Sequence, residues 1–236
     1  MCLILLAWRV HERYPLVVAA NRDEFHGRPA ARAAFWDDKP EVLAGRDLQA
    51  GGTWMGVSRN GRFAAVTNYR GATEPGAPES RGALVTRYLE GAEVPALAER
   101  KAEYSGFNLL ASDGEELWWL SNRDGAPRRL EPGWYGLGNL LLDSPDVEPH
   151  KRRFRDCLVS VEPLFEVLAQ AKIVDGRYGT RSASVLIAGE TTLFSERAFG
   201  PDGSEDSTLR YELRTRRIAR CGMPASSNSA PMGAKP

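Results

Sequence analysis

The feature that most constrains the fold is a short apolar segment at the very start of the chain, Leu3–Trp8. A run of this length without polar alternation is typical of a strand buried on both faces, so a strand is expected over Cys2–Trp8. A polar turn, His11–Pro15, separates it from a second apolar run, Leu16–Ala20. The two runs predict a hairpin that starts a sheet, with the N-terminus folded inside the protein.

This N-terminal segment differs from an export signal. Arg9, Glu12 and Arg13 follow the apolar run at once, whereas a signal peptide carries positive charge before a longer apolar region. A membrane-spanning helix needs about 20 apolar residues, and the sequence has no such run. We therefore expect a cytoplasmic protein with no membrane span.

The overall charge and the cysteines exclude several classes of partner. Lys plus Arg equals Asp plus Glu at 31 each, so no net field attracts nucleic acid, and no nucleic-acid partner is expected. The three cysteines, Cys2, Cys157 and Cys221, are far apart and show no CxxC spacing. That arrangement argues against a metal site and a disulfide framework, and favours a reducing compartment.

Strands are predicted in both halves of the chain, with helices grouped between them. Beyond the first hairpin, strands are expected over residues 51–58, 62–68, 107–111, 117–121, 134–142, 182–188, 191–198 and 209–213. Helices are expected over 82–89, 94–103 and 149–170, the last with Pro163 as a point of kinking or division. This order suits an α+β fold. We expect one domain over 1–220, a mobile loop over 69–80 and a disordered tail over 221–236.

Cys2 is the strongest candidate for a reactive group. Removal of Met1 before a small residue would leave a thiol and a free α-amine on the same residue. Their reference pKa values, about 8.5 and 8, make proton transfer between them nearly balanced. The amine can then act as general base while the thiolate attacks a carbonyl. The alternative is a buried cysteine that only starts a core strand.

Charged residues follow the second apolar run, where its strand is expected to end beside residue 2. Arg22 is predicted to stabilise the thiolate and bind a substrate carboxylate, and Asp23 to hold the α-ammonium group. Adjacent strand residues face opposite sides, so both reach Cys2 only if the chain turns there. The alternative is an ion-pair network that closes a loop.

Two side-chain amides and one arginine complete the candidate site. Asn68 and Asn139 stand at the ends of predicted strands, where an amide can donate to an oxyanion. Arg181 precedes the strand at 182–188 and offers another positive charge. The alternatives are turn residues that bond their own backbone and a surface arginine.

An ordered series of motifs in the chain resembles the NRDE family, also called the Transport and Golgi organisation protein 2 family. The motifs are MCLILLAW, AANRDEF, GGTWMGVS, TNYR, SRGALV, GFNLL, YGLGN and GTRSASVLI, from residue 1 to residue 187. The resemblance implies a four-layer αββα sandwich similar to N-terminal-nucleophile hydrolases. It implies that Cys2 occupies the place of their nucleophile, Asn68 that of their oxyanion asparagine, and Asn139 and Arg181 those of a later Asn and Arg. At 21–24 the order Asn-Arg-Asp-Glu departs from the Arg-Asn-x-Asp of those hydrolases.

Two functions remain open from the sequence. One is an N-terminal-cysteine amidohydrolase or acyl transferase that acts on an amide or thioester of a small molecule and needs no cofactor. The other is a non-catalytic protein that binds or traffics haem or lipid, with Cys2 or a histidine as a haem ligand. A scaffold with an unused pocket is a third alternative, and the sequence does not determine the oligomeric state.

Overall fold

The computed structural model describes residues 2–71 and 77–214. Within them the chain forms two antiparallel sheets. The first sheet has the strand order β10-β1-β2-β11-β12-β13. Its strands are β1 (Leu3–Trp8), β2 (Leu16–Phe25), β10 (Gly133–Leu137), β11 (Tyr178–Ala188), β12 (Thr192–Phe199) and β13 (Glu205–Leu213).

The second sheet follows the order of the sequence, from β3 to β9. Its strands are β3 (Ala30–Trp36), β4 (Lys39–Asp47), β5 (Met55–Ser58), β6 (Phe63–Asn68), β7 (Phe107–Ser112), β8 (Leu117–Ser121) and β9 (Arg128–Arg129). The strands expected over residues 51–58 and 62–68 pair as the β5–β6 hairpin, and those expected over 107–111 and 117–121 pair as the β7–β8 hairpin.

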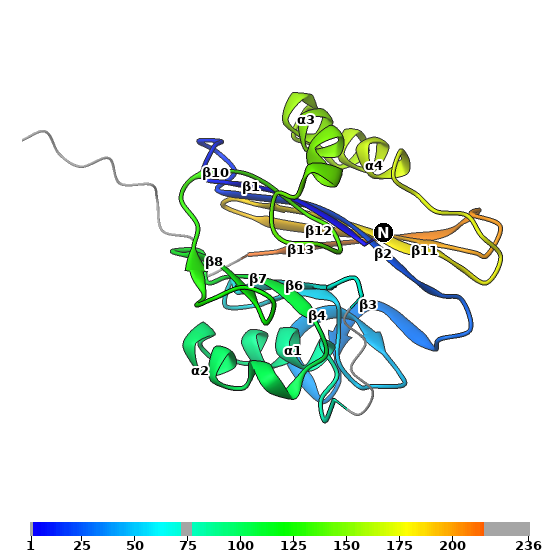
Figure 1. Ribbon diagram of the computed structural model, residues 1–236. Coiled ribbons are helices and arrows are strands. Elements are labelled where there is room, and N and C mark those ends of the chain that lie inside the picture. The colour runs from blue at the N-terminus through cyan, green and yellow to red at the C-terminus, as the bar shows by residue number, and fades with distance from the viewer. Residues whose placement is uncertain (1, 72–76, 215–236) are drawn as a thin grey trace, which may run out of the picture.

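The two sheets pack face to face, and helices cover their outer faces (Figure 1). Helices α3 (Glu148–Asp156) and α4 (Val161–Ala169) lie over the first sheet, and α1 (Gly82–Leu89) and α2 (Val94–Glu99) over the second. This arrangement confirms the four-layer αββα sandwich. Each sheet is buried on both sides because each lies between a helical layer and the other sheet.

Strand β1 has apolar contacts on both faces of the first sheet. Its alternate residues Ile4, Leu6 and Trp8 join the core between the sheets, whereas the residues between them pack against α3 and α4. All six residues are buried. The unbroken apolar run therefore reflects a strand with apolar contacts on both faces.

The helix expected over 149–170 is two helices. The chain leaves helical geometry at Cys157, whose φ and ψ are extended, and enters α4 after Ser160. Leu158 follows Phe154 at helical spacing, so a single helix would bury it on the same face. In the structure it lies between the two helices and is 77% exposed. Pro163 lies in the first turn of α4, where its missing N–H costs little, so the division comes before it. The helix expected over 94–103 likewise ends at Glu99, and a 3₁₀ turn follows over Lys101–Glu103.

Strand boundaries also differ from the predictions. Strands β3 and β4 were not predicted. Neither shows a regular alternation of apolar and polar residues, because buried and exposed residues mix irregularly along them. The strand expected over 134–142 ends at Leu137. Asp143 there adopts a positive φ of 57°, and its carboxylate accepts a hydrogen bond from the Gly136 N–H at 2.8 Å, which turns the chain back. The expected tail over 221–236 lies outside the described residues, as does the middle of the loop at 69–80.

Candidate functional site

Cys2 lies at the end of β1, between two neighbouring strands of the first sheet. Leu3 pairs with Asn21 of β2, and Ile4 pairs with Leu137 of β10. Both pairings are antiparallel, so Cys2, one residue before Leu3, lies next to Arg22 of β2. The pairing with β10 ends at Ile4 and Leu137, two residues before Asn139. The sheet register therefore brings Cys2 and Arg22 together.

The expectation that the second strand ends before the charged residues is wrong. Strand β2 continues to Phe25, and β11 pairs with it as far as Phe25. Because side chains alternate along a strand, Arg22 faces the space between the sheets and Asp23 faces the helical layer. The guanidinium of Arg22 lies 4.3 Å from the Trp54 ring centroid. The carboxylate of Asp23 accepts a hydrogen bond from the Thr180 hydroxyl at 2.6 Å.

The sulfur of Cys2 sits against the backbone of Asp23. Its Sγ is 3.4 Å from both the carbonyl oxygen and the amide nitrogen of Asp23. Burial raises the pKa of the thiol, and the negative charge of Asp23 raises it further, while the Asp23 N–H and the Arg22 charge act in the other direction. The resting thiol therefore holds its proton at neutral pH and needs a base to become a nucleophile.

The two asparagines are joined to each other. The Asn139 side-chain amide donates to the backbone oxygen of Asn68 at 3.0 Å, and the Asn139 carbonyl accepts from the Arg70 N–H at 2.6 Å. Asn68 ends β6 of the second sheet, and its side chain is exposed. The bond thus ties the end of β6 to the segment that follows β10, and leaves the Asn68 amide open to solvent.

Arg181 lies inside β11, where the sequence predicted it just before the strand. The pairing of β11 with β2 shifts register between Thr180 and Ser182, so Arg181 occupies a bulge. Its guanidinium donates to the carbonyl oxygens of Phe25 and Arg28, at 3.0 and 2.8 Å. The bulge places Arg181 beside the site. Burial lowers the pKa of Arg22, and the charge of Arg181 lowers it further.

Sequence reasoning missed Arg81. It precedes α1, on the other sheet's helical layer, and its guanidinium donates to the Gly106 carbonyl at 3.2 Å. Burial lowers its pKa, while the charges of Cys2 and Glu24 raise it, so it lies within electrostatic reach of the thiol. The signal for it was available, since Arg81 stands in the SRGALV motif.

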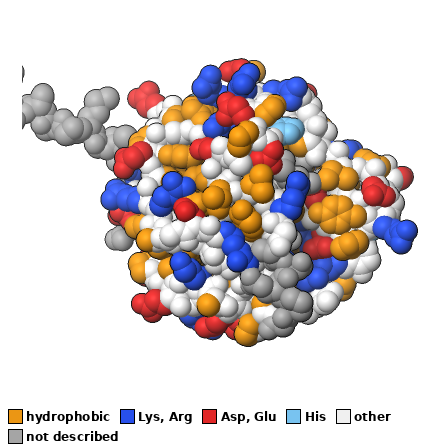
Figure 2. Space-filling view, viewed as in Figure 1, with side chains coloured by type: hydrophobic (Ala, Val, Ile, Leu, Met, Phe, Trp, Pro, Cys, Tyr) orange, Lys and Arg blue, Asp and Glu red, His pale blue; other side chains and the backbone are white. Residues whose placement is uncertain are grey.

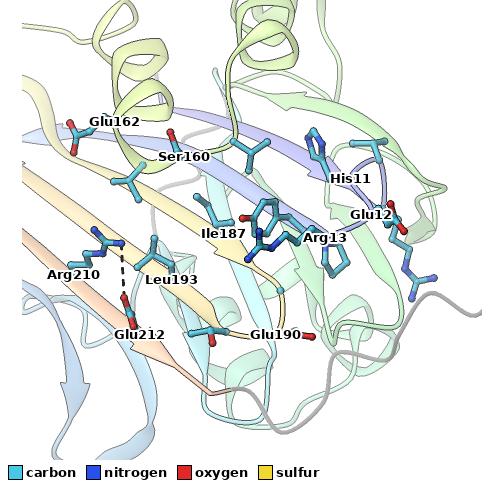
Figure 3. Close-up of a pocket in the computed structure, with 18 residues that line it drawn as sticks. His11, Glu12, Arg13, Ser160, Glu162, Ile187, Glu190, Leu193, Arg210 and Glu212 are labelled. Carbon is cyan, nitrogen blue, oxygen red and sulfur yellow. Dashed lines mark ion pairs between the residues drawn. The ribbon is translucent and has the colours of Figure 1, made fainter.

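A cavity of about 1290 Å³ lies at the opposite end of the first sheet (Figure 3). It is lined by the turn between β1 and β2, the start of α4 and the turn between β11 and β12, and its residues include His11, Arg13, Val161, Ile187, Leu193 and Arg210. Strand β1 separates this cavity from Cys2 by about 20 Å, at 3.3 Å per residue. None of the predicted site residues lines it.

Charges of both signs are interspersed on the face of the molecule in Figure 2. This surface agrees with the equal numbers of basic and acidic residues. Among residues 2–71 and 77–214, no helix is long and apolar enough to cross a membrane. The same residues contain no cluster of three or more His, Cys, Asp and Glu side chains that could hold a metal ion.

The fold is similar to that of two solved amide hydrolases. A mutant of the conjugated bile acid hydrolase from Clostridium perfringens superimposes with a TM-score of 0.54, over 92% of this chain and 94% of that one, at 8% identity. The N-acylethanolamine-hydrolyzing acid amidase orthologue of Caenorhabditis elegans gives 0.50, over 79% and 92%, at 9% identity. The chain therefore has the N-terminal-nucleophile-hydrolase fold.

Closer relatives are found by sequence. The chain is 32% identical to the Bos taurus Transport and Golgi organization protein 2 homolog, over 85% of this chain and 93% of that one. It is 41% identical to the Homo sapiens homolog over 56% and 53% of the two chains. The family described as Transport and Golgi organisation 2 matches residues 1–174. The chain belongs to the Transport and Golgi organisation 2 family.

Proposed function

We propose that the protein is an N-terminal-cysteine hydrolase or acyl transferase that acts on an amide or thioester. The observation that carries the proposal is the position of Cys2, at the end of β1 beside Arg22 and against the Asp23 backbone, in an N-terminal-nucleophile-hydrolase fold. Of the two solved neighbours named above, one is described as an N-acylethanolamine-hydrolyzing acid amidase orthologue and the other as a conjugated bile acid hydrolase. Fold alone does not specify chemistry, so the proposal depends on the site.

The first step needs a base, because burial raises the pKa of the Cys2 thiol. After removal of Met1, the α-amine of Cys2 accepts the thiol proton, and the thiolate attacks the carbonyl carbon. The new C–S bond forms as the C=O π pair moves to oxygen. When this intermediate collapses, the leaving amine or thiol takes the proton and an acyl thioester on Cys2 remains. Water or an acceptor amine then attacks the thioester and restores the thiol.

The negative oxygen of the intermediate requires hydrogen-bond donors. The exposed amide of Asn68 is suited to this, because its backbone is held by the Asn139 side chain at 3.0 Å. Asn139 acts in this scheme as a positioning residue, since its own amide is used in that bond. Asp23 is suited to orient the α-ammonium group, because it is buried and the Thr180 hydroxyl fixes its carboxylate.

The test combines mass spectrometry with turnover. Intact mass of purified protein reports whether Met1 is removed, and peptide mapping after brief exposure to a chloroacetamide compares labelling of Cys2 with that of Cys157, a half-buried cysteine in the same chain. We expect loss of Met1, faster labelling at Cys2, and hydrolysis of N-acyl amides or thioesters that disappears in Cys2→Ala. Retained Met1, or hydrolysis that survives in Cys2→Ala, would refute the proposal.

A second function, binding of haem or lipid without catalysis, is favoured by the cavity in Figure 3. Its volume of about 1290 Å³ exceeds that of typical small-molecule pockets. His11 lies in its wall, with its ring edge-on to Trp134 at 5.1 Å, and its Nε2 is buried without a hydrogen-bond partner among the described residues. The imidazole is thus the better candidate haem ligand than Cys2, which does not line the cavity.

Titration with haemin tests this function. We expect a new absorption band in the wild type that shifts or disappears in His11→Ala and persists in His26→Ala, because His26 does not line the cavity. A band that is identical in all three proteins would exclude His11 as the ligand. A fluorescent fatty acid, displaced or not by haemin, distinguishes lipid from haem.

A further inference from the structure

Arg22 is buried without the partners that a buried arginine normally has. Its side chain is 6% exposed, yet its guanidinium makes no hydrogen bond to any other residue in the described part of the chain. Its contacts are the Trp54 ring at 4.3 Å and a Glu24 oxygen at 3.8 Å, which is beyond hydrogen-bond distance. A guanidinium has five N–H donors, and no nitrogen of Arg22 is among the fully buried, unpaired side-chain atoms of the described residues, so these donors keep contact with solvent. Arg22 is therefore suited to bind an anion that arrives from outside.

Two further arginines approach the same point from different elements. Arg181 comes from the bulge in β11, one position before Ser182, which pairs with Arg22. Arg81 comes from the start of α1, and the charges of Cys2 and Glu24 act on it. Each uses donors on backbone carbonyls, which hold it in place. Arg22 and Arg81 thus act on the thiol, and Arg181 acts on Arg22 from the neighbouring strand.

Carboxylates lie near the same arginines. Glu24 is 3.8 Å from Arg22, and Asp47 pairs with Arg28 at 2.7 Å. Asp23 acts on Cys2, and the buried Glu196 acts on Arg22. None of these carboxylates comes within hydrogen-bond distance of the Arg22 guanidinium, so its donors stay available to a ligand.

We propose that this cluster binds a carboxylate of the substrate, held by Arg22, Arg81 and Arg181 next to the carbonyl that Cys2 attacks. The inference rests on the proposed function and names its substrate class: N-acyl amino acids, or related acyl conjugates with a carboxylate close to the scissile bond. A planar carboxylate matches the fork of a guanidinium in a bidentate pair.

The first test measures the charge around the thiol and needs no catalysis. Iodoacetate and iodoacetamide alkylate cysteine in the same way but differ in charge. We expect the iodoacetate-to-iodoacetamide rate ratio to be at least about threefold higher at Cys2 than at Cys157, because the positive charges of Arg22 and Arg81 attract the anionic reagent to Cys2. The ratio should fall in Arg81→Ala, remain in Arg81→Lys, and be unchanged in Arg152→Ala on the exposed side of α3. Equal ratios at Cys2 and Cys157 in the wild type would overturn the inference.

The second test uses a matched pair of substrates, an N-acylglycine and the corresponding N-acylglycinamide. We expect kcat/KM to be at least about tenfold higher for the acid, the value of one charged hydrogen bond, and this preference to shrink in Arg81→Ala. Equal turnover of both would leave the hydrolase standing and refute the carboxylate site. A raised alkylation ratio without any turnover would support the anion site and refute the hydrolase. An N-acyl aminomethylphosphonate preferred over the acid would assign the cluster to a dianion, against the proposal.

Discussion

Gly52 tests whether the site depends on a close approach between two backbones. A Cβ added at Gly52 would lie 2.5 Å from the carbonyl carbon of Gly82 and 2.9 Å from the nitrogen of Ala83. Gly82 is the first residue of α1, directly after Arg81. The contacts are backbone atoms on both sides, so no flexible side chain can yield. Gly52→Ala must therefore move the start of α1, and Arg81 with it.

The size of the effect follows from these distances. Carbon atoms pack at about 3.5–4.0 Å, so the two segments must separate by about 1 Å. Overpacking of this kind costs roughly 1–3 kcal/mol. In a domain of this size each kcal/mol lowers Tm by about 2–4 °C, and we expect a loss of about 4–8 °C for a cost near 2 kcal/mol. The Thr53 N–H bond to the Gly82 carbonyl, 3.3 Å long, should be lost as well.

Urea and thermal unfolding of Gly52→Ala and Gly27→Ala measure the effect. Gly27 is the matched control, because a Cβ there meets nothing within 4 Å and its φ is not in the left-handed region; its stability should stay within about 0.5 kcal/mol of the wild type or rise slightly. If Gly52→Ala unfolds at the same urea midpoint and Tm as the wild type, the backbones at Gly52 and Gly82 do not lie this close together. The iodoacetate ratio at Cys2 should fall with the displacement of Arg81.

Two further predictions concern the core. Burial raises the pKa of Glu196, whose Oε1 accepts from the Ala33 N–H at 2.8 Å, so the native state keeps the proton to a higher pH than the unfolded chain. The wild type should therefore lose stability as pH rises from about 4 through the native pKa of Glu196. The urea midpoint of Glu196→Gln should rise relative to that of the wild type between pH 5 and 7.5. A difference between the two midpoints that does not change with pH would contradict this. Phe154→Ala, which empties the contact of α3 with Trp134, should cost about 3–5 kcal/mol, whereas Leu158→Ala should cost little because Leu158 is 77% exposed. Equal losses in the two variants would contradict the packing of α3.

Local patterns predicted the strands at the start of the chain well. The first two apolar runs became β1 and β2, and the β5–β6 hairpin forms around the Asn60-Gly61 turn. In each case the signal lay in neighbouring residues, either an apolar run or a pair that favours positive φ; Gly61 has a φ of 90°. Such signals depend on short-range geometry, which the sequence displays directly.

Longer-range contacts decided the features that local patterns missed. Periodicity joined α3 and α4, because it cannot show that the chain leaves the sheet surface at Cys157. The polar residues after Ala20 hid the continuation of β2, which exists because β11 supplies hydrogen-bond partners as far as Phe25. Tertiary contacts override local preference at such positions.

Two features follow from the residues alone. Apolar runs that need cover on both faces predicted the layered sandwich, and the position of Cys2 directly after Met1 made it the candidate nucleophile. The surroundings of the thiol depend on long-range contacts instead. Antiparallel pairing of β1 with β2 places Cys2 beside Arg22, and the start of α1, in the helical layer of the other sheet, brings Arg81 within electrostatic reach. These residues are far apart in the chain, and strand pairing and core packing, which no local pattern encodes, bring them together.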